Sequence, residues 1–194
     1  MTSIRNTTTE DRLLDAARDS ILSVGWRRTT LTDVARRAGV SRMTVYRTYP
    51  DMTGLLGDLM TREWLQMLAE LEDHAPGLPA AERIAARVLA AVRALRANPL
   101  FHRIVDVDPE LLLPYLLERR GRSQSAVIEL LADAIATAQA DGEVRAGDPP
   151  RLARSMVLAA HGFALSHQTM TDDEVGSDDL DADLVEMITR FLTP

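Results

Sequence analysis

Apolar residues recur at helical spacing along almost the whole chain, and this feature limits the possible folds more than any other. In residues 9–24, for example, Leu13, Leu14, Ala17 and Ile21 fall on one helical face. No alternating strand pattern, internal repeat or low-complexity tract interrupts the series. The sequence therefore predicts an all-α fold of roughly nine or ten helices.

Glycines and prolines mark where these helices should end. Gly25, Gly39 and Pro50 close the first three. We expect helices over residues 9–24, 30–38, 41–49, 51–71, 80–97, 100–105, 109–118, 122–140, about 151–170 and 182–192. Polar residues 1–8 predict an arm, and residues 75–79, with two prolines and a glycine, predict a loop.

Several classes of protein are disfavoured by what the sequence lacks. It has no cysteine, so disulfides and thiolate metal sites are excluded. No apolar run reaches the length of a membrane span, and the first residues do not resemble a signal peptide, so we expect a cytoplasmic protein. Common catalytic signatures such as HExxH, GxxxxGK[ST] and GxSxG are missing. We therefore expect no enzyme activity, no cofactor and no metal site.

The net charge of −7 is unevenly distributed along the chain. Residues 1–52 hold nine arginines against six acidic residues, a net charge of +3, whereas residues 53–194 carry −10. A small basic region joined to an acidic remainder is typical of a protein that presents one end to a polyanion.

Within the basic region, a short turn joins two of the expected helices. Gly39 can adopt the left-handed backbone of the turn, Val40 can pack inward, and Ser41 can cap the following helix. This pattern predicts a helix-turn-helix, whose second helix lies in the major groove of DNA. A helical hairpin with a solvated arginine face would show the same turn.

The first side chains of that second helix are the expected base readers. Arg42 can make a bidentate contact with guanine, and Met43 or Thr44 can meet a thymine methyl group. The hydroxyl groups of nearby tyrosine and threonine residues, and the guanidinium group of a nearby arginine, suit phosphate contacts. The full predicted DNA-binding set is Thr30, Ser41, Arg42, Met43, Thr44, Tyr46, Arg47 and Tyr49.

Residues 29–50 read TTLTDVARRAGVSRMTVYRTYP. This string resembles the DNA-binding signature of the tetracycline-repressor (TetR) family, and the resemblance extends over about residues 10–56. It implies a helix-turn-helix DNA-binding domain over 9–50 and a helical ligand-binding and dimerisation domain over 51–194. Two positions depart from the family pattern. Met52 stands where members often carry a phosphate-contacting lysine, and Met43 where a small residue is common.

The resemblance implies a sequence-specific DNA-binding transcriptional regulator, most simply a homodimeric repressor that a small-molecule ligand releases from double-stranded operator DNA. Two alternatives stay open. The chain can be a ligand-binding or adaptor protein whose helix-turn-helix no longer binds DNA, as Met43 and Met52 allow, or a transcriptional activator. The sequence identifies neither the ligand nor the operator.

The acidic region supplies the expected ligand and dimer contacts. The stretch 155–171 has no charged residue, and a helix so apolar must be covered on all sides. With the last helix, it predicts a dimer interface formed by Ala160, Gly162, Phe163, Leu184, Ile188 and Phe191. A core helix within one chain is the alternative. Large apolar and a few polar side chains predict a ligand cavity lined by Trp64, Met67, Leu68, Phe101, His102, Tyr115, Met156 and His161. For each of these residues taken alone, packing in the core is the alternative.

Overall fold

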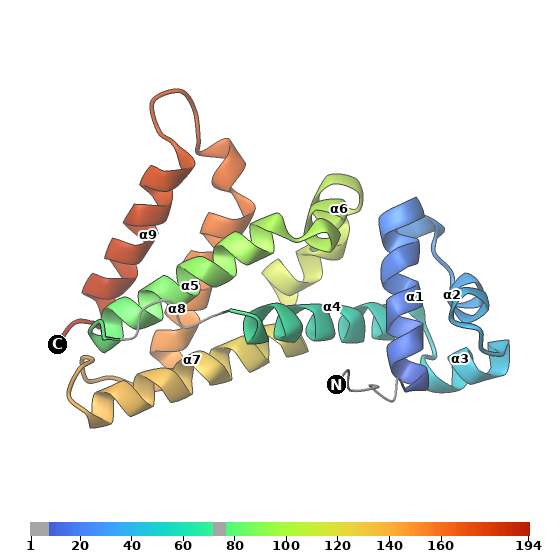
Figure 1. Cartoon of the computed structure of the whole chain (residues 1–194), viewed down its shortest axis with the longest axis horizontal. Helices are drawn as coiled ribbons and strands as arrows, with labels where there is room; N and C mark the ends of the chain where they lie inside the picture. The colour runs from blue at the N-terminus through green and yellow to red at the C-terminus, as the bar shows by residue number, and fades with distance from the viewer. Residues whose placement is uncertain (1–7, 72–76) are drawn as a thin grey trace, which may run out of the picture. The chain divides into compact units, whose positions relative to one another are not determined.

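A computed structural model of the chain describes residues 8–71 and 77–194. All regular structure within these residues is helical, as the sequence predicts (Figure 1). The α-helices are α1 (Thr9–Val24), α2 (Leu31–Ala38), α3 (Arg42–Thr48), α4 (Met52–Ala69), α5 (Ala80–Ala97), α6 (Pro99–Val107), α7 (Arg122–Ala140), α8 (Pro149–Leu165) and α9 (Ser177–Leu192). The expected arm at 1–8, except Thr8, and residues 75 and 76 of the expected loop lie outside the described residues.

The packing divides the chain into two compact units, each with its own apolar core. The first unit comprises residues 8–64 and 98–122, and the second comprises 65–71, 77–97 and 123–194. Helix α4 therefore begins in the first unit and ends in the second. The functional division at residues 50 and 51 stays a prediction.

The core of the first unit is built by α1, α2, α3, the first half of α4, and α6. Leu13 and Ile21 of α1 lie in it beside Val34 of α2 and Val45 of α3, all at most 1% exposed. Helices α4 and α6 contribute Leu55, Leu59, Leu100 and Ile104, which are also at most 1% exposed. The helix-turn-helix thus shares its core with two later helices instead of closing on itself.

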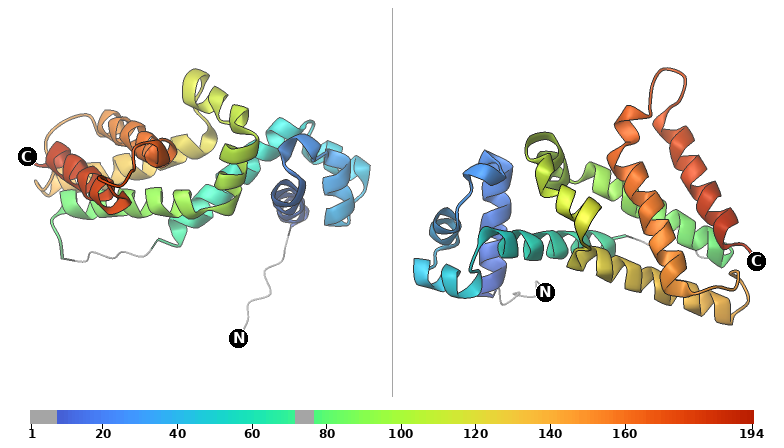
Figure 2. Two further views of the ribbon diagram at one scale, coloured as in Figure 1. Left: turned by 90° about the horizontal axis from the view of Figure 1, so that it is seen from above. Right: turned by 180° about the vertical axis from the view of Figure 1, so that it is seen from behind.

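The second unit is a bundle in which α5 packs against α8 and α9 (Figure 2). Its largest fully buried side chains are Ile135, Leu152, Met156, Leu184 and Leu192. Asp181 of α9 is 3% exposed and is held by Arg93 and Arg96 of α5. The Arg93 Nε atom lies 2.6 Å from an Asp181 carboxylate oxygen. These two arginines join the surfaces of α5 and α9 above the apolar core.

Two expected helices in the second half of the chain have different bounds in the structure. Helix α9 begins at Ser177, five residues before the expected start at Ala182, because the Asp179 carboxylate accepts the Gly176 N–H at 2.8 Å. Acidic side chains in a first turn also complement the helix dipole. Helix α8 ends at Leu165, where Ser166 begins a 3-10 turn over His167–Thr169. The expected helix to residue 170 is therefore wrong in its last turn.

The segment 109–118 is also less regular than expected. Pro109–Leu111 is a 3-10 turn and Pro114–Glu118 is a single turn of π-helix. Pro114 has no N–H to donate, so the regular α-helical ladder cannot pass through it. The Arg119 N–H instead donates to the Pro114 carbonyl at 2.8 Å.

Candidate functional site

The turn between α2 and α3 has the geometry that the sequence predicts for a helix-turn-helix. Gly39 has φ +67° and ψ +35°, and the N–H of Val40 donates to the Ala35 carbonyl at 3.0 Å. A Cβ atom on Gly39 would meet no neighbour within 4 Å. Glycine is therefore favoured here by its left-handed backbone and not by crowding.

Helix α3 presents its first residues and one side to solvent. Met43 is 78% exposed and Tyr46 is 52% exposed. Arg42 and Arg47 are exposed as well, while Thr44 is half-buried. Val45, which is fully buried, fixes the opposite side of the helix in the core. Two guanidinium groups, a phenol and a thioether therefore stand together on one exposed helix.

Tyr49 differs from this group and is a correction to the sequence prediction. It was expected to contact phosphate, but it is only 3% exposed and belongs to the core of the first unit. Its hydroxyl donates to a Glu10 carboxylate oxygen at 3.4 Å. Burial first, and then the Glu10 carboxylate, raise the pKa of Tyr49 to about 12. Tyr49 therefore anchors the end of α3 to α1 and offers nothing to DNA.

The hydroxyl groups of Thr30 and Ser41 cap the two helices. Thr30 Oγ1 accepts the Asp33 N–H at 3.2 Å and donates to the Asp33 carboxylate at 2.6 Å. The hydrogen bond from the Thr30 hydroxyl to the Asp33 carboxylate is the main reason that the pKa of Asp33 is lowered, and Arg36 makes a smaller contribution. Ser41 Oγ accepts the Thr44 N–H at 3.1 Å. Both caps are exposed, so these residues combine a structural role with a position at the surface.

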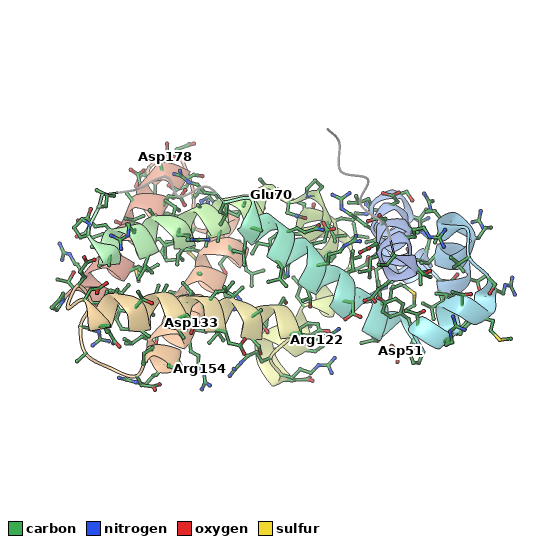
Figure 3. The ribbon with its side chains drawn as sticks, turned by 60° about the horizontal axis from the view of Figure 1, so that its bottom comes forward. Asp51, Glu70, Arg122, Asp133, Arg154 and Asp178 are labelled. Carbon is green, nitrogen blue, oxygen red and sulfur yellow. The ribbon has the colours of Figure 1, made fainter. Side chains whose placement is uncertain are left out.

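Helix α4 begins at Met52, which is one of the two positions that depart from the family pattern. Met52 is half-buried and packs against the core of the first unit. The Asp51 carboxylate, labelled in Figure 3, accepts the Gly54 N–H at 2.8 Å. An acidic group therefore occupies a backbone donor that a phosphate could otherwise use.

The predicted ligand-binding residues are distributed over both units. In the first unit, the rings of Trp64 and Phe101 meet edge to face with centroids 6.0 Å apart. Phe101 is 7% exposed, His102 is exposed, and the half-buried Tyr115 has the Arg119 guanidinium 5.3 Å from its ring centroid.

The other four predicted ligand residues lie in the second unit. Met156 is 2% exposed and forms part of its core. Met67, Leu68 and His161 are half-buried, and burial lowers the pKa of His161.

The predicted dimer residues separate into two groups. Leu184 and Ile188 are 0% and 3% exposed and pack inside their own chain's core, so they are not available to a partner. Ala160, Phe163 and Phe191 are half-buried beside that core. Gly162 is exposed, and a Cβ atom on it would meet nothing within 4 Å.

Two exposed apolar residues, one on α8 and one on α9, were missed by the sequence analysis. Leu158 of α8 is 74% exposed and Met187 of α9 is 53% exposed. The uncharged stretch 155–171 was the available signal, but periodicity does not reveal which face of such a helix its own chain leaves uncovered. Leu158, Gly162 and Met187 are referred to below as the α8–α9 surface.

Two buried carboxylates of the first unit were also missed. Glu63 of α4 is 8% exposed and accepts from Arg18 Nε of α1 at 3.0 Å. Asp108, at the end of α6, is 1% exposed and accepts the Trp26 N–H at 2.9 Å. Acidic residues are frequent in this chain, and nothing in the sequence distinguishes these two from the solvated ones.

In the described part of the chain, no group of histidine and acidic side chains is arranged to hold a metal ion. Among the same residues, no helix is long and apolar enough to cross a membrane.

Comparison with known proteins identifies the family. A family model described as bacterial regulatory proteins, tetR family, matches residues 13–59. An uncharacterized HTH-type transcriptional regulator of Mycobacterium tuberculosis is 33% identical over 184 residues, which cover 95% of this chain and 94% of the relative.

Solved structures show the same fold. The TetR-family transcriptional repressor QsdR of R. erythropolis has a TM-score of 0.71 at 16% identity, with 94% of each chain covered. The TetR-family repressor AlkX of a Dietzia species has a TM-score of 0.69 at 21% identity, with 95% of each chain covered. With the recognition-helix geometry and a relative that matches over nearly its whole length, the chain belongs to the tetR family of bacterial regulatory proteins.

Proposed function

We propose that this protein is a homodimeric transcriptional repressor that binds operator DNA through α3 of each subunit and is released by a small-molecule ligand. The observation that carries the proposal is the exposed side of α3, where Arg42, Met43, Tyr46 and Arg47 stand on a helix fixed by buried Val45. As a regulatory protein it acts by binding and not by catalysis. Its place of action is the bacterial cytoplasm, where the operator is.

The side chains of α3 and of the two helix caps have distinct roles at the DNA surface. Arg42 reads guanine through two parallel hydrogen bonds, and Met43 and Thr44 contact thymine methyl groups. Tyr46 and Arg47 bind phosphate and fix the register without reading sequence. Thr30 and Ser41 present their helix caps to the backbone of the duplex. Because Asp51 occupies the donor of Gly54, the start of α4 contributes little to phosphate binding.

The α8–α9 surface supports a dimer. A leucine that is 74% exposed beside an uncrowded, exposed glycine allows close approach of a second helix pair. Two-fold symmetry then presents two recognition helices to half-sites about 34–36 Å apart. Leu184 and Ile188, which pack in the core of their own chain, are not part of the proposed interface.

Control by a ligand requires only modest coupling between two sites. Helix α4 starts next to the recognition helix in sequence and carries Trp64, which contacts Phe101 of α6. A ligand that displaces these rings shifts α4 and thereby changes the spacing between the two recognition helices of the dimer. A coupling free energy of about 1–3 kcal/mol is sufficient, and operator DNA then weakens ligand binding by the same factor.

A gel-shift titration against the DNA upstream of the protein's own gene tests the central claim. Arg42→Ala should weaken operator binding by about 1–3 kcal/mol and relax specificity at one base position. Arg87→Ala is the matched control, because Arg87 is exposed on α5 in the second unit and its loss changes the net charge equally.

Specificity decides between a repressor and an adaptor that no longer binds DNA. Wild-type protein should bind its operator far more tightly than random duplex at the same salt concentration. Equal affinity for the two DNAs would contradict the proposal.

A further inference from the structure

Asp108 is a buried carboxylate at the junction between α6 and the helix-turn-helix. It follows the last residue of α6 and is 1% exposed. Burial of a carboxylate is costly unless hydrogen bonds and opposite charges compensate it. Its contacts therefore show what holds it in this position.

These contacts all lie at the corner between α1 and α2. One Asp108 carboxylate oxygen accepts the Trp26 N–H at 2.9 Å, and the other lies 3.6 Å from Arg27 Nε. Glu110, two residues further on, accepts from Arg27 at 2.6 Å on the exposed side of the same corner. The end of α6 thus binds the backbone of Trp26 through a hydrogen bond and the side chain of Arg27 through its carboxylates.

Gly25 lies beside this contact and has a backbone conformation that favours glycine. Its φ of +85° is unfavourable for other residues, and a Cβ atom there would lie 3.5 Å from Asp108 and 3.6 Å from Arg103. A side chain at this position would be strained by the backbone, whereas its Cβ atom would make only ordinary van der Waals contacts with α6. Gly25, which ends α1, is also the residue of the α1–α2 corner that lies against the end of α6.

The corner determines where α2 begins. The 3-10 turn Trp26–Arg28 connects α1 to α2, and buried Thr29 donates its hydroxyl to the Gly25 carbonyl at 2.8 Å. Helix α2 then packs on both α1 and α3. A displaced corner therefore moves α2, and through the turn at Gly39 it moves α3.

We propose that Asp108 is a positioning residue for operator binding: it fastens the α1–α2 corner to α6, so that the recognition helix is presented in one orientation. The proposal rests on the DNA-binding function above. A dimer must deliver two recognition helices at a fixed spacing. A loosened corner adds freedom that is lost on binding, which weakens specific binding without removing any phosphate contact.

Three variants test this role. Asp108→Leu keeps the size of the side chain and removes both acceptors, whereas Asp108→Asn retains one oxygen that can accept the Trp26 N–H. Asp106→Leu is the matched control, since Asp106 is an exposed carboxylate on the same helix. Each variant is compared with wild type in gel shifts on the upstream DNA at several salt concentrations, and in amide hydrogen exchange at Trp26.

The positioning role predicts a specific pattern. Asp108→Leu should bind the operator about tenfold more weakly with an unchanged salt slope, since the slope counts phosphate contacts. Its Trp26 amide should exchange at least about tenfold faster, because the hydrogen bond that protects it is gone. Asp108→Asn should be rescued to within about threefold of wild type in both measurements, and Asp106→Leu should match wild type.

Other results overturn the proposal. The proposal is wrong if Asp108→Leu binds the operator as tightly as wild type, or if its salt slope differs from that of wild type. It is also wrong if Asp108→Asn is as impaired as Asp108→Leu. If Asp108→Leu does not fold, Trp26 exchange in wild type and in Asp108→Asn decides, because fast exchange in wild type excludes the hydrogen bond. A wild type that binds no duplex contradicts the repressor function itself, which is a different failure.

Discussion

Two tyrosines three residues apart have opposite roles at the end of the recognition helix. Tyr46 is 52% exposed on α3, whereas Tyr49 is 3% exposed in the core of the first unit. On a helix, a shift of three residues should keep a side chain on the same face. Tyr49, however, follows the last residue of α3 and has an extended backbone, with φ −129° and ψ +107°, which turns its ring inward. The two side chains have the same phenol group, and the backbone conformation determines whether that group faces solvent or the core.

This difference predicts separable effects of two alanine substitutions. If Tyr46 contacts phosphate as proposed, Tyr46→Ala should weaken binding to all duplexes alike, and it should leave the unfolding free energy nearly unchanged because the side chain is 52% exposed. Tyr49→Ala should lower the unfolding free energy by about 3–5 kcal/mol, as the loss of a large buried ring does. Urea denaturation and gel shifts on both variants measure the two effects. A Tyr49→Ala protein of wild-type stability would contradict the core role.

At the scale of elements, α5 and α9 share an apolar core and are also joined by one buried carboxylate. Asp181 of α9 meets Arg93 and Arg96 of α5, and Arg93 also lies 3.7 Å from Asp178. Burial acts to raise the pKa of Asp181, but hydrogen bonds from Arg96 and Arg93 outweigh it, and the pKa is lowered. A lowered pKa in the folded state links this contact to stability.

The sign of that linkage gives a pH prediction. The unfolded chain protonates Asp181 near pH 3.9, before the folded chain does, so its stabilising contribution is complete above about pH 4 and is lost as pH falls further toward the folded pKa. Asp181→Asn should lower the unfolding free energy by about 1–3 kcal/mol at pH 7. The loss should shrink below pH 4.

A matched control lies one turn earlier on the same helix. Asp178 contacts the same arginine but has a fully exposed side chain, so Asp178→Asn should change stability by less than about 0.5 kcal/mol. Urea unfolding at pH 7 and at pH 3 separates the two positions. Equal effects of Asp178→Asn and Asp181→Asn would show that burial does not matter here.

At the scale of the whole molecule, the proposed function requires a dimer that presents two recognition helices. The chain leaves Leu158, Gly162 and Met187 uncovered on the α8–α9 surface, although α8 has no charged residue after Arg154. An apolar surface of this kind on a regulator that reads two half-sites is most simply covered by a second copy.

Charge placed on this surface should therefore separate the subunits. Leu158→Arg or Gly162→Arg should give monomers in light scattering at micromolar concentration and lose operator binding at the same time. Leu130→Arg is the control, because Leu130 is 56% exposed on α7, away from the α8–α9 surface in sequence. Dimers that persist in the first two variants would place the interface elsewhere.

The sequence by itself determined the helical class, the position of the helix-turn-helix and its turn at Gly39. These features depend on interactions between residues at most four or five positions apart, such as periodic apolar faces, caps and a left-handed glycine. The same local signals placed Arg42, Met43 and Tyr46 at an exposed surface, where the structure has them.

Only the tertiary structure decided which apolar and acidic residues face inward. An apolar stripe states that a residue faces something apolar, and it does not state whether the neighbour is its own chain or a partner. Leu184 therefore belongs to the core and Leu158 to the surface. Asp108 is buried because Trp26, more than eighty residues earlier, supplies its hydrogen bond. Contacts between such distant residues depend on how the helices pack, which no local pattern records.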